Sequence, residues 1–199
     1  MMSVPAPVIE EAASGSQRGV RFSCSGCGNC CHLRIPVNDR DVARILAETG
    51  LALDEVVEFV RPAEFRGEPD HLAFVWFGPR RSDRRVMCLR ESGGHCRFLT
   101  ADRRCAIYSC RPVVCRSHPF VLEASACGRR IEALEMNYDC DCAATRGAVR
   151  TEAELITLDR WSAAEDSRYG ALVARWNRSR RRRTEARFLE YVGMLPPQA

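Results

Sequence analysis

The chain has 199 residues, enough for one medium-sized domain with a buried core. Hydrophobic residues make up 46% and charged residues 28%, values that exclude a disordered or fibrous protein. The net charge is only +4, and all 30 basic residues are arginine, a composition that by itself indicates no particular class of partner.

The cellular compartment follows from what the termini and the cysteines suggest. No segment reaches the roughly 18 apolar residues that a membrane span needs. Met1–Gln17 holds a short apolar patch, Val4–Ile9, without a preceding basic stretch, so we expect no secretory signal and a cytoplasmic location. Thiols stay reduced there, and twelve cysteines therefore predict metal ligation rather than disulfides.

Two short helices are predicted after the first cysteines. Asn38 or Asp39 can cap a helix that runs to about Glu48 and ends at Gly50. Asp54 can cap a second helix, whose apolar residues would be Val56, Val57 and Val60. The pair resembles a helix–turn–helix in outline, but the second helix is acidic, so we do not expect it to read DNA.

Two hairpins are predicted in the middle of the chain. His71–Phe77 is aromatic and β-branched, and Arg85–Leu89 would return as its partner strand. Phe120–Ala124 and Ile131–Tyr138 would form another hairpin around Gly128. A group of cysteines lies between the two hairpins.

The C-terminal part is predicted to be helical from Thr151, which forms a capping box with Glu154. Apolar residues then recur at helical spacing, namely Leu155, Leu158, Trp161, Leu172, Trp176, Phe188, Leu189 and Tyr191. Arg178 and Arg180–Arg183 form the strongest charge run. We interpret this run as a solvated face rather than as a phosphate or nucleic-acid site.

The first cysteine cluster is Cys24-x2-Cys27-x2-Cys30-Cys31. Gaps of two residues let a tight turn direct successive sulfurs at one metal centre, and intervening glycines suit such a turn. A fourth ligand is needed to close a tetrahedral or cubane site. Adjacent side chains tend to diverge, so we expect Cys30 and Cys31 to have different roles.

The second group of cysteines, Cys96, Cys105 and Cys115, is too widely spaced for one local turn. Only the fold can gather these sulfurs, and we expect them to supply the ligands that the first cluster lacks. Thiolate ligands suit both zinc and iron–sulfur centres, with a small preference for iron–sulfur.

The two groups together resemble the CxxCxxCC (YkgJ-type) family, a zinc- or iron-chelating domain. The resemblance rests on Phe22-x-Cys24-x2-Cys27-Gly28-x-Cys30-Cys31, Cys96-x-Phe98-Leu99, Cys105-x-Ile107-Tyr108 and Arg111-Pro112-x2-Cys115-Arg116-x2-Pro119. It covers about residues 20 to 142. The metal ligands it implies are Cys24, Cys27, Cys30, Cys31, Cys96, Cys105, Cys115 and, by a weaker match, Cys140.

Several other residues have a plainer explanation beside the functional one. Cys88, Cys110, Cys127 and Cys142 match no required family position and are expected to be core or surface thiols. His32, His95 and His118 each lie beside or near a presumed ligand, and proximity without coordination is the preferred interpretation for the first two. Arg111 and Arg116 could offset thiolate charge or make structural hydrogen bonds.

We therefore predict an α+β fold: a small cysteine-rich domain organised by metal, with short β-hairpins and helices, and a C-terminal helical extension. The predicted divisions are a flexible lead-in at 1–19, the metal-binding domain at 20–145 and the extension at 146–199. The expected function is metal binding with a redox or accessory role and a protein partner, without nucleic acid or membrane. The alternatives are a zinc-stapled interaction domain and, because flagellin lysine N-methylases carry a similar cluster, a protein-modifying enzyme.

Overall fold

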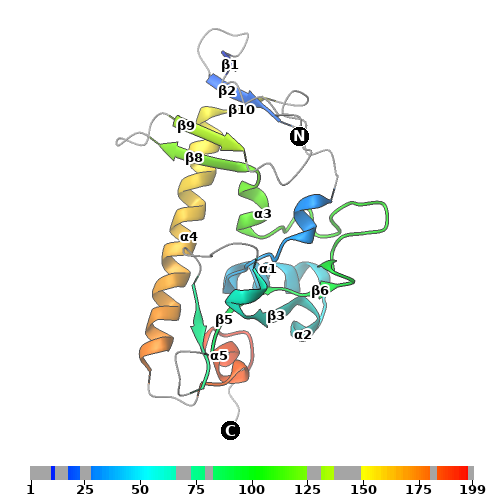
Figure 1. Cartoon of the computed structure of the whole chain (residues 1–199), viewed down its shortest axis with the longest axis vertical. Coiled ribbons are helices and arrows are strands. Elements are labelled where there is room, and N and C mark those ends of the chain that lie inside the picture. The colour runs from blue at the N-terminus through cyan, green and yellow to red at the C-terminus, as the bar shows by residue number, and fades with distance from the viewer. Residues whose placement is uncertain are drawn as a thin grey trace.

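The fold mixes helices with small antiparallel sheets, which confirms the predicted α+β class (Figure 1). It is known from a computed structural model that describes residues 10–11, 18–22, 28–65, 73–78, 83–124, 131–136, 149–179 and 183–196. Among these residues, no helix has both the length and the apolar character needed to cross a membrane.

The helices are short except for one. They are α1 (Asp39–Thr49), α2 (Leu53–Val56), α3 (Val113–Ser117), α4 (Glu152–Arg178) and α5 (Glu185–Tyr191), with 3-10 turns η1 (Asn29–His32) and η2 (Pro62–Glu64). The strands are β1 (Glu10–Glu11), β2 (Arg18–Arg21), β3 (Val57–Val60), β4 (Val75–Trp76), β5 (Arg84–Leu89), β6 (Glu91–Ser92), β7 (His95–Cys96), β8 (Phe120–Ala124), β9 (Ile131–Met136) and β10 (Val149–Thr151). They pair in the orders β1-β2-β10, β3-β5-β4, β6-β7 and β8-β9.

Helix α1 forms where its capping residues predict it. The Asn38 side chain accepts a hydrogen bond from the Asp41 amide, and the Asp41 carboxylate accepts one from the Asn38 amide. At the other end, Gly50 adopts a left-handed conformation, with φ of 66°, that a side chain would disfavour. Both boundaries depend on neighbouring residues alone, which is why the sequence predicts them.

The predicted second helix is wrong beyond Val56. The chain leaves α2 after one turn and continues as β3, which pairs antiparallel with β5. Val57 and Val60 are β-branched and Phe59 is aromatic, so all three favour a strand once a partner is available. The helix–turn–helix outline disappears with this change.

The two predicted hairpins are present. Strands β4 and β5 pair antiparallel, although β4 contains only Val75 and Trp76; residues 71 and 72 lie outside the described part of the chain. Strands β8 and β9 pair from Phe120 opposite Met136 to Ala124 opposite Ile131. Figure 1 shows this hairpin lying across the N-terminal part of α4.

Helix α4 begins at the predicted capping box of Thr151 and Glu154 and runs along one side of the fold (Figure 1). Its first turns bury Leu155 and Ile156 in a small core, whose other buried members are Val20 and Ile131. Its later turns bury Tyr169, Val173 and Trp176 in the main core. They pack there with residues of α1, β5 and α5, namely Val42, Ile45, Met87, Leu89 and Phe188. The predicted domain division remains a prediction.

Asp41 joins two parts of the chain that the sequence separates widely. Its side chain is 2% exposed, and its carboxylate accepts from the Asn38 amide at 3.3 Å, from the Val113 amide at 3.1 Å and from Arg44. Burial raises the pKa of this carboxyl, and the three donors act in the opposite direction. The start of α3, which carries Cys115, is thereby fixed to the start of α1.

Replacing Asp41 with Ala should destabilise the fold by about 2 to 4 kcal/mol, because the buried amide of Val113 loses its acceptor and the α1 cap is lost. The free energy of unfolding from urea titration measures this change. Glu48→Ala, at an exposed position on the same helix, is the matched control and should change the free energy by less than about 0.5 kcal/mol. Equal effects of the two substitutions would contradict the anchoring role of Asp41.

Candidate metal centre

The end of the first cysteine cluster lies against the second group. Turn η1, which contains Cys30 and Cys31, contacts strand β7, which contains Cys96. The rings of His32 and His95 meet edge to face, with centroids 5.7 Å apart. Two segments more than sixty residues apart in sequence are therefore neighbours in the fold.

Gly28 permits this close approach. It has a φ of 74°, and a Cβ atom at this position would lie 3.1 Å from a methyl carbon of Leu99. Next to it, the Asn29 side-chain oxygen accepts a hydrogen bond from Arg103 at 3.2 Å. Gly28 and Asn29 thus lie directly against the loop between Cys96 and Cys105.

Within the second group, hydrogen bonds to backbone carbonyls fold the chain back on itself. The Leu99 amide donates to the Cys96 carbonyl at 3.0 Å, and Leu99 forms an isolated β-bridge with Cys105. Further along, Arg116 donates to the carbonyls of Ser109 at 2.8 Å and of Arg111 at 2.9 Å. These bonds bring Cys96, Cys105 and the start of α3 around one turn.

The thiols of Cys30, Cys96, Cys105 and Cys115, here called the four-thiol cluster, lie close enough to influence one another electrostatically. Burial, followed by the charges of the other three thiolates, raises the pKa of Cys115. Burial raises the pKa of Cys96 to about 11, and the charges of Cys105 and Cys30 add to this effect. Two parts of the chain, the turn at Cys30 and the stretch from Cys96 to Cys115, therefore place sulfur in one region.

Cys30 and Cys31 do not diverge as expected. A hydrogen bond with the Cys31 thiol, followed by burial, raises the pKa of Cys30. The tight 3-10 turn at Asn29–His32 keeps the two side chains near each other. Cys31 is only partly buried and packs against the main core.

The donor chemistry of the four-thiol cluster fits a zinc or iron–sulfur centre, because thiolates are the preferred ligands of both. Within the described part of the chain, no three His, Cys, Asp or Glu side chains are spaced to hold a metal ion. Cys24, Cys27 and Cys140 lie outside the described residues. The implied set of eight ligands therefore remains a prediction.

The remaining cysteines divide by location. Cys88 is fully buried in a separate small cluster with Val60 and Val86, and Cys110 is 7% exposed in the main core. Both locations suit ordinary core thiols. Cys127 and Cys142 lie outside the described residues.

The two arginines of this region differ in their surroundings. Arg116 bonds backbone carbonyls and lies over the Trp161 ring, so its contacts are structural. The Arg111 guanidinium lies 3.8 Å from the centroid of the Tyr108 ring. Its charge lowers the pKa of Cys30, Cys105 and Cys115, against the larger effects that raise them.

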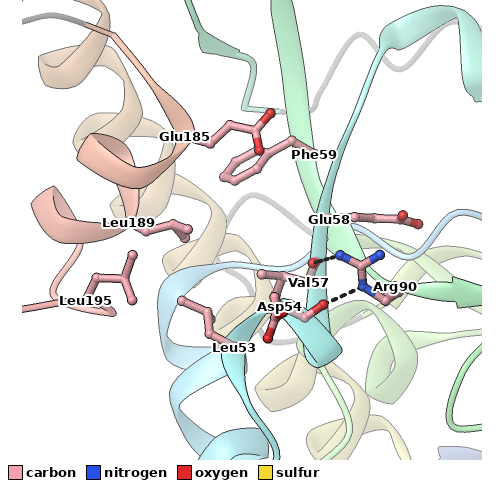
Figure 2. Close-up of a pocket in the computed structure, with 9 residues that line it drawn as sticks. All are labelled: Leu53, Asp54, Val57, Glu58, Phe59, Arg90, Glu185, Leu189 and Leu195. Carbon is pink, nitrogen blue, oxygen red and sulfur yellow. Dashed lines mark hydrogen bonds between the residues drawn. The ribbon is translucent and has the colours of Figure 1, made fainter.

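A groove of about 570 Å³ lies elsewhere, between α2, β3 and α5 (Figure 2). Its apolar residues are Leu53, Val57, Phe59, Leu189 and Leu195, and its charged residues are Asp54, Glu58, Arg90 and Glu185. Figure 2 shows Arg90 donating to the backbone carbonyls of Asp54 and Val57. Glu58 pairs with Arg34, and Glu185 pairs with Arg85. Most of the charged residues of the groove are therefore already engaged in hydrogen bonds or ion pairs within the protein. No cysteine lines the groove.

Sequence reasoning alone missed Asp41 as a residue that positions this region, and it named Arg111 without its contact to Tyr108. Asp41 reaches Val113 across 72 residues, and no local pattern indicates that contact. The stacking of Arg111 on Tyr108 is also unforeseen, although both belong to the quoted family motif. Tyr108 and Arg111 are three positions apart in the sequence, and this spacing is the one signal that could have suggested their contact.

The metal-free protein should lose stability as the pH rises above about 9. The buried thiol of Cys96 stays protonated to about pH 11, against an ordinary value of 9.0, so the unfolded chain releases its proton first. Stability is therefore complete below the unfolded pKa and falls between pH 9 and 11, by about 1 kcal/mol for this thiol at pH 9.5. Urea unfolding of metal-free protein across this range measures the effect, and a flat profile would contradict the burial of the thiols.

Comparison with known proteins places the chain in a family. The pattern of the CxxCxxCC family, described as "Putative zinc- or iron-chelating domain", matches residues 23–143. An uncharacterized protein of Methanocaldococcus jannaschii is 31% identical over 107 residues, which make up 53% of this chain and 48% of that protein. The chain thus matches about half the length of this curated relative, and no solved structure matches it. Because the family pattern covers more than half of the sequence, the chain belongs to the CxxCxxCC family.

Proposed function

We propose that the protein binds a zinc ion or an iron–sulfur centre through thiolates of its two cysteine groups. The observation that carries this proposal is the four-thiol cluster, in which Cys30 of the first group lies near Cys96, Cys105 and Cys115 of the second, all of them buried or partly buried. Cysteines that only fill the core would not be expected to cluster with other cysteines. Binding to a common metal ion would explain why these four lie together.

The electrostatics of the cluster support a metal rather than a nucleophilic cysteine. Burial and the charges of nearby thiolates raise the pKa of Cys96, Cys105 and Cys115, and a hydrogen bond with Cys31, followed by burial, raises the pKa of Cys30. A reactive cysteine needs the opposite shift, toward a stable thiolate at neutral pH. A bound cation would reverse these shifts for all members of the cluster at once.

Of the two centres, we favour iron–sulfur by a small margin because every proposed ligand is a thiolate. A zinc ion that staples the segments together is the alternative, and it would act through stability instead of electron transfer. We also propose a cytoplasmic protein that works with a protein partner. The half-exposed Tyr108 and Val114, both next to cluster segments, are surfaces that such a partner could contact.

Purification without oxygen separates the two centres. An iron–sulfur protein should be brown, with visible absorption, iron and acid-labile sulfide in fixed ratio to the chain. A zinc protein should be colourless and should contain stoichiometric zinc. Protein that contains neither metal, and takes up neither under reducing conditions, would refute the proposal.

Replacing Cys115 with Ala should weaken metal binding by about 100-fold or more. Loss of a residue that only hydrogen-bonds a ligand lowers metal affinity by about 10- to 100-fold, and loss of the ligand itself should lower it at least as much. Metal content and competition with a chelator give the measurement.

Cys88→Ala is the control, since Cys88 is a fully buried cysteine that belongs to the separate cluster around Val60 and Val86. It should keep full metal content even if it lowers stability. Equal loss of metal in the two variants would show that the four-thiol cluster is wrongly assigned.

Removal of the metal by a chelator should lower the melting temperature by about 5 to 10 °C, because binding at 100 times the dissociation constant adds about 2.7 kcal/mol to the free energy of unfolding. Differential scanning calorimetry of loaded and stripped protein measures the shift, and re-addition of metal should restore it. An unchanged melting temperature would contradict the view that the centre ties the segments together.

A further inference from the structure

We propose that the groove between α2, β3 and α5 is a docking site for a peptide segment of a partner protein, one that carries apolar side chains next to arginine or lysine. No cysteine lines the groove, so this inference does not rest on the proposed metal centre. The chemistry of the segment follows from two features that meet at the groove, an apolar lining and an excess of acidic side chains.

The first observation is the apolar lining of the groove. Leu53, Phe59 and Leu189 are partly buried and pack against the main core, and Leu195 is partly buried as well. Figure 2 shows Leu189 and Leu195 on one side of the groove and Leu53 and Val57 on the other. Apolar side chains that stay partly accessible in one hollow are typical of surfaces that bind an apolar segment of another molecule.

The walls of the groove are tied together by contacts within the protein. The Phe59 ring of β3 meets the Phe188 ring of α5 edge to face, with centroids 5.9 Å apart. On the other wall, Arg90 donates to the carbonyls of Asp54 at 2.5 Å and of Val57 at 3.3 Å, which fixes the step from α2 to β3. A groove that is already formed loses less conformational entropy on binding, so that a short peptide can bind it.

The second observation is the acidic character of the lining. Asp54, Glu58 and Glu185 line the groove together with one arginine, Arg90. The Arg90 guanidinium donates to backbone carbonyls instead of pairing with these carboxylates. Asp54 is exposed, and no arginine in the described part of the chain forms an ion pair with its carboxylate.

The arginines that pair with the other two carboxylates are themselves shared. Arg34 pairs with three carboxylates, those of Glu58, Glu64 and Glu91. Arg85 pairs with two, those of Glu185 and Asp83. With Asp54 and Arg90 included, six carboxylates around the groove accompany three arginines, in a chain whose net charge is +4. This local surplus of negative charge favours a basic partner and disfavours an acidic one.

The two features have different tasks in recognition. Burial of apolar surface against the lining supplies most of the affinity, because exposed ion pairs contribute little. The carboxylates select the sign of the charge, since they attract a basic residue beside the apolar side chains and repel an acidic one. Asp54, which follows Leu53 directly, is the carboxylate best placed to receive the cation.

The test selects ligands for the purified full chain from a phage-displayed library of random short peptides and measures their binding by fluorescence anisotropy. The selected peptides should combine large apolar side chains with arginine or lysine. Leu195→Asp, which places a charge among the apolar side chains, should weaken their binding by about 10-fold or more. Asp54→Lys should weaken it by about 3- to 10-fold, because an attraction becomes a repulsion.

Asp102→Lys is the matched control, because it makes the same change of charge at a side chain that is 67% exposed and does not line the groove. It should leave peptide binding unchanged. Asp54→Lys should melt within about 2 °C of wild type and keep the wild-type metal content, since the Asp54 side chain is exposed. The comparison of Asp54→Lys with Asp102→Lys therefore decides the role of charge even if Leu195→Asp destabilises the fold.

Three results would overturn the proposal: selected peptides that are acidic or uncharged, basic peptides that bind Asp54→Lys as tightly as Asp102→Lys, or a library that yields no ligand. A wild-type dimer that Leu195→Asp converts to a monomer in analytical ultracentrifugation would overturn it in favour of a second copy of this chain. None of these results depends on whether the protein holds a metal, which its metal content decides separately.

Discussion

The cost of ionising thiols that lie close together and away from water is the constraint on which the rest of this structure depends. Burial raises the pKa of Cys96, Cys105 and Cys115, and the charge of Cys30 adds to this effect for all three. A hydrogen bond with Cys31, followed by burial, raises the pKa of Cys30 itself. Without a cation the thiols must stay protonated and act as weak apolar fillers. With one, the same closeness becomes an advantage, because all the charges converge on a single positive centre.

The scaffold around the cluster is built to keep these segments together. Asp41 fixes the start of α3 to α1, Arg116 closes the turn before α3, and the absence of a side chain at Gly28 leaves room for Leu99. None of these contacts involves a sulfur atom. The geometry of the cluster is therefore supported by ordinary hydrogen bonds and packing, which a metal would reinforce instead of creating outright.

The sequence predicts those parts of the fold that depend on neighbouring residues. The caps of α1 and α4 and the β8–β9 hairpin follow from local patterns. The segment Val57–Val60 could not be predicted as a strand, since its conformation depends on pairing with β5, nearly thirty residues away. The approach of the two cysteine groups could be anticipated from their residue types, but the contacts that enforce it, such as Asp41 with Val113, span too much sequence to be read locally.

X-ray absorption at the metal edge of the loaded protein tests the central claim most directly, because it reports the atoms bound to the metal. The account predicts a shell of sulfur atoms at about 2.3 Å, the distance of a thiolate from zinc, with at most a minor contribution from nitrogen or oxygen. A shell dominated by nitrogen or oxygen would contradict it, since the cysteines would then have gathered for a reason other than holding the metal.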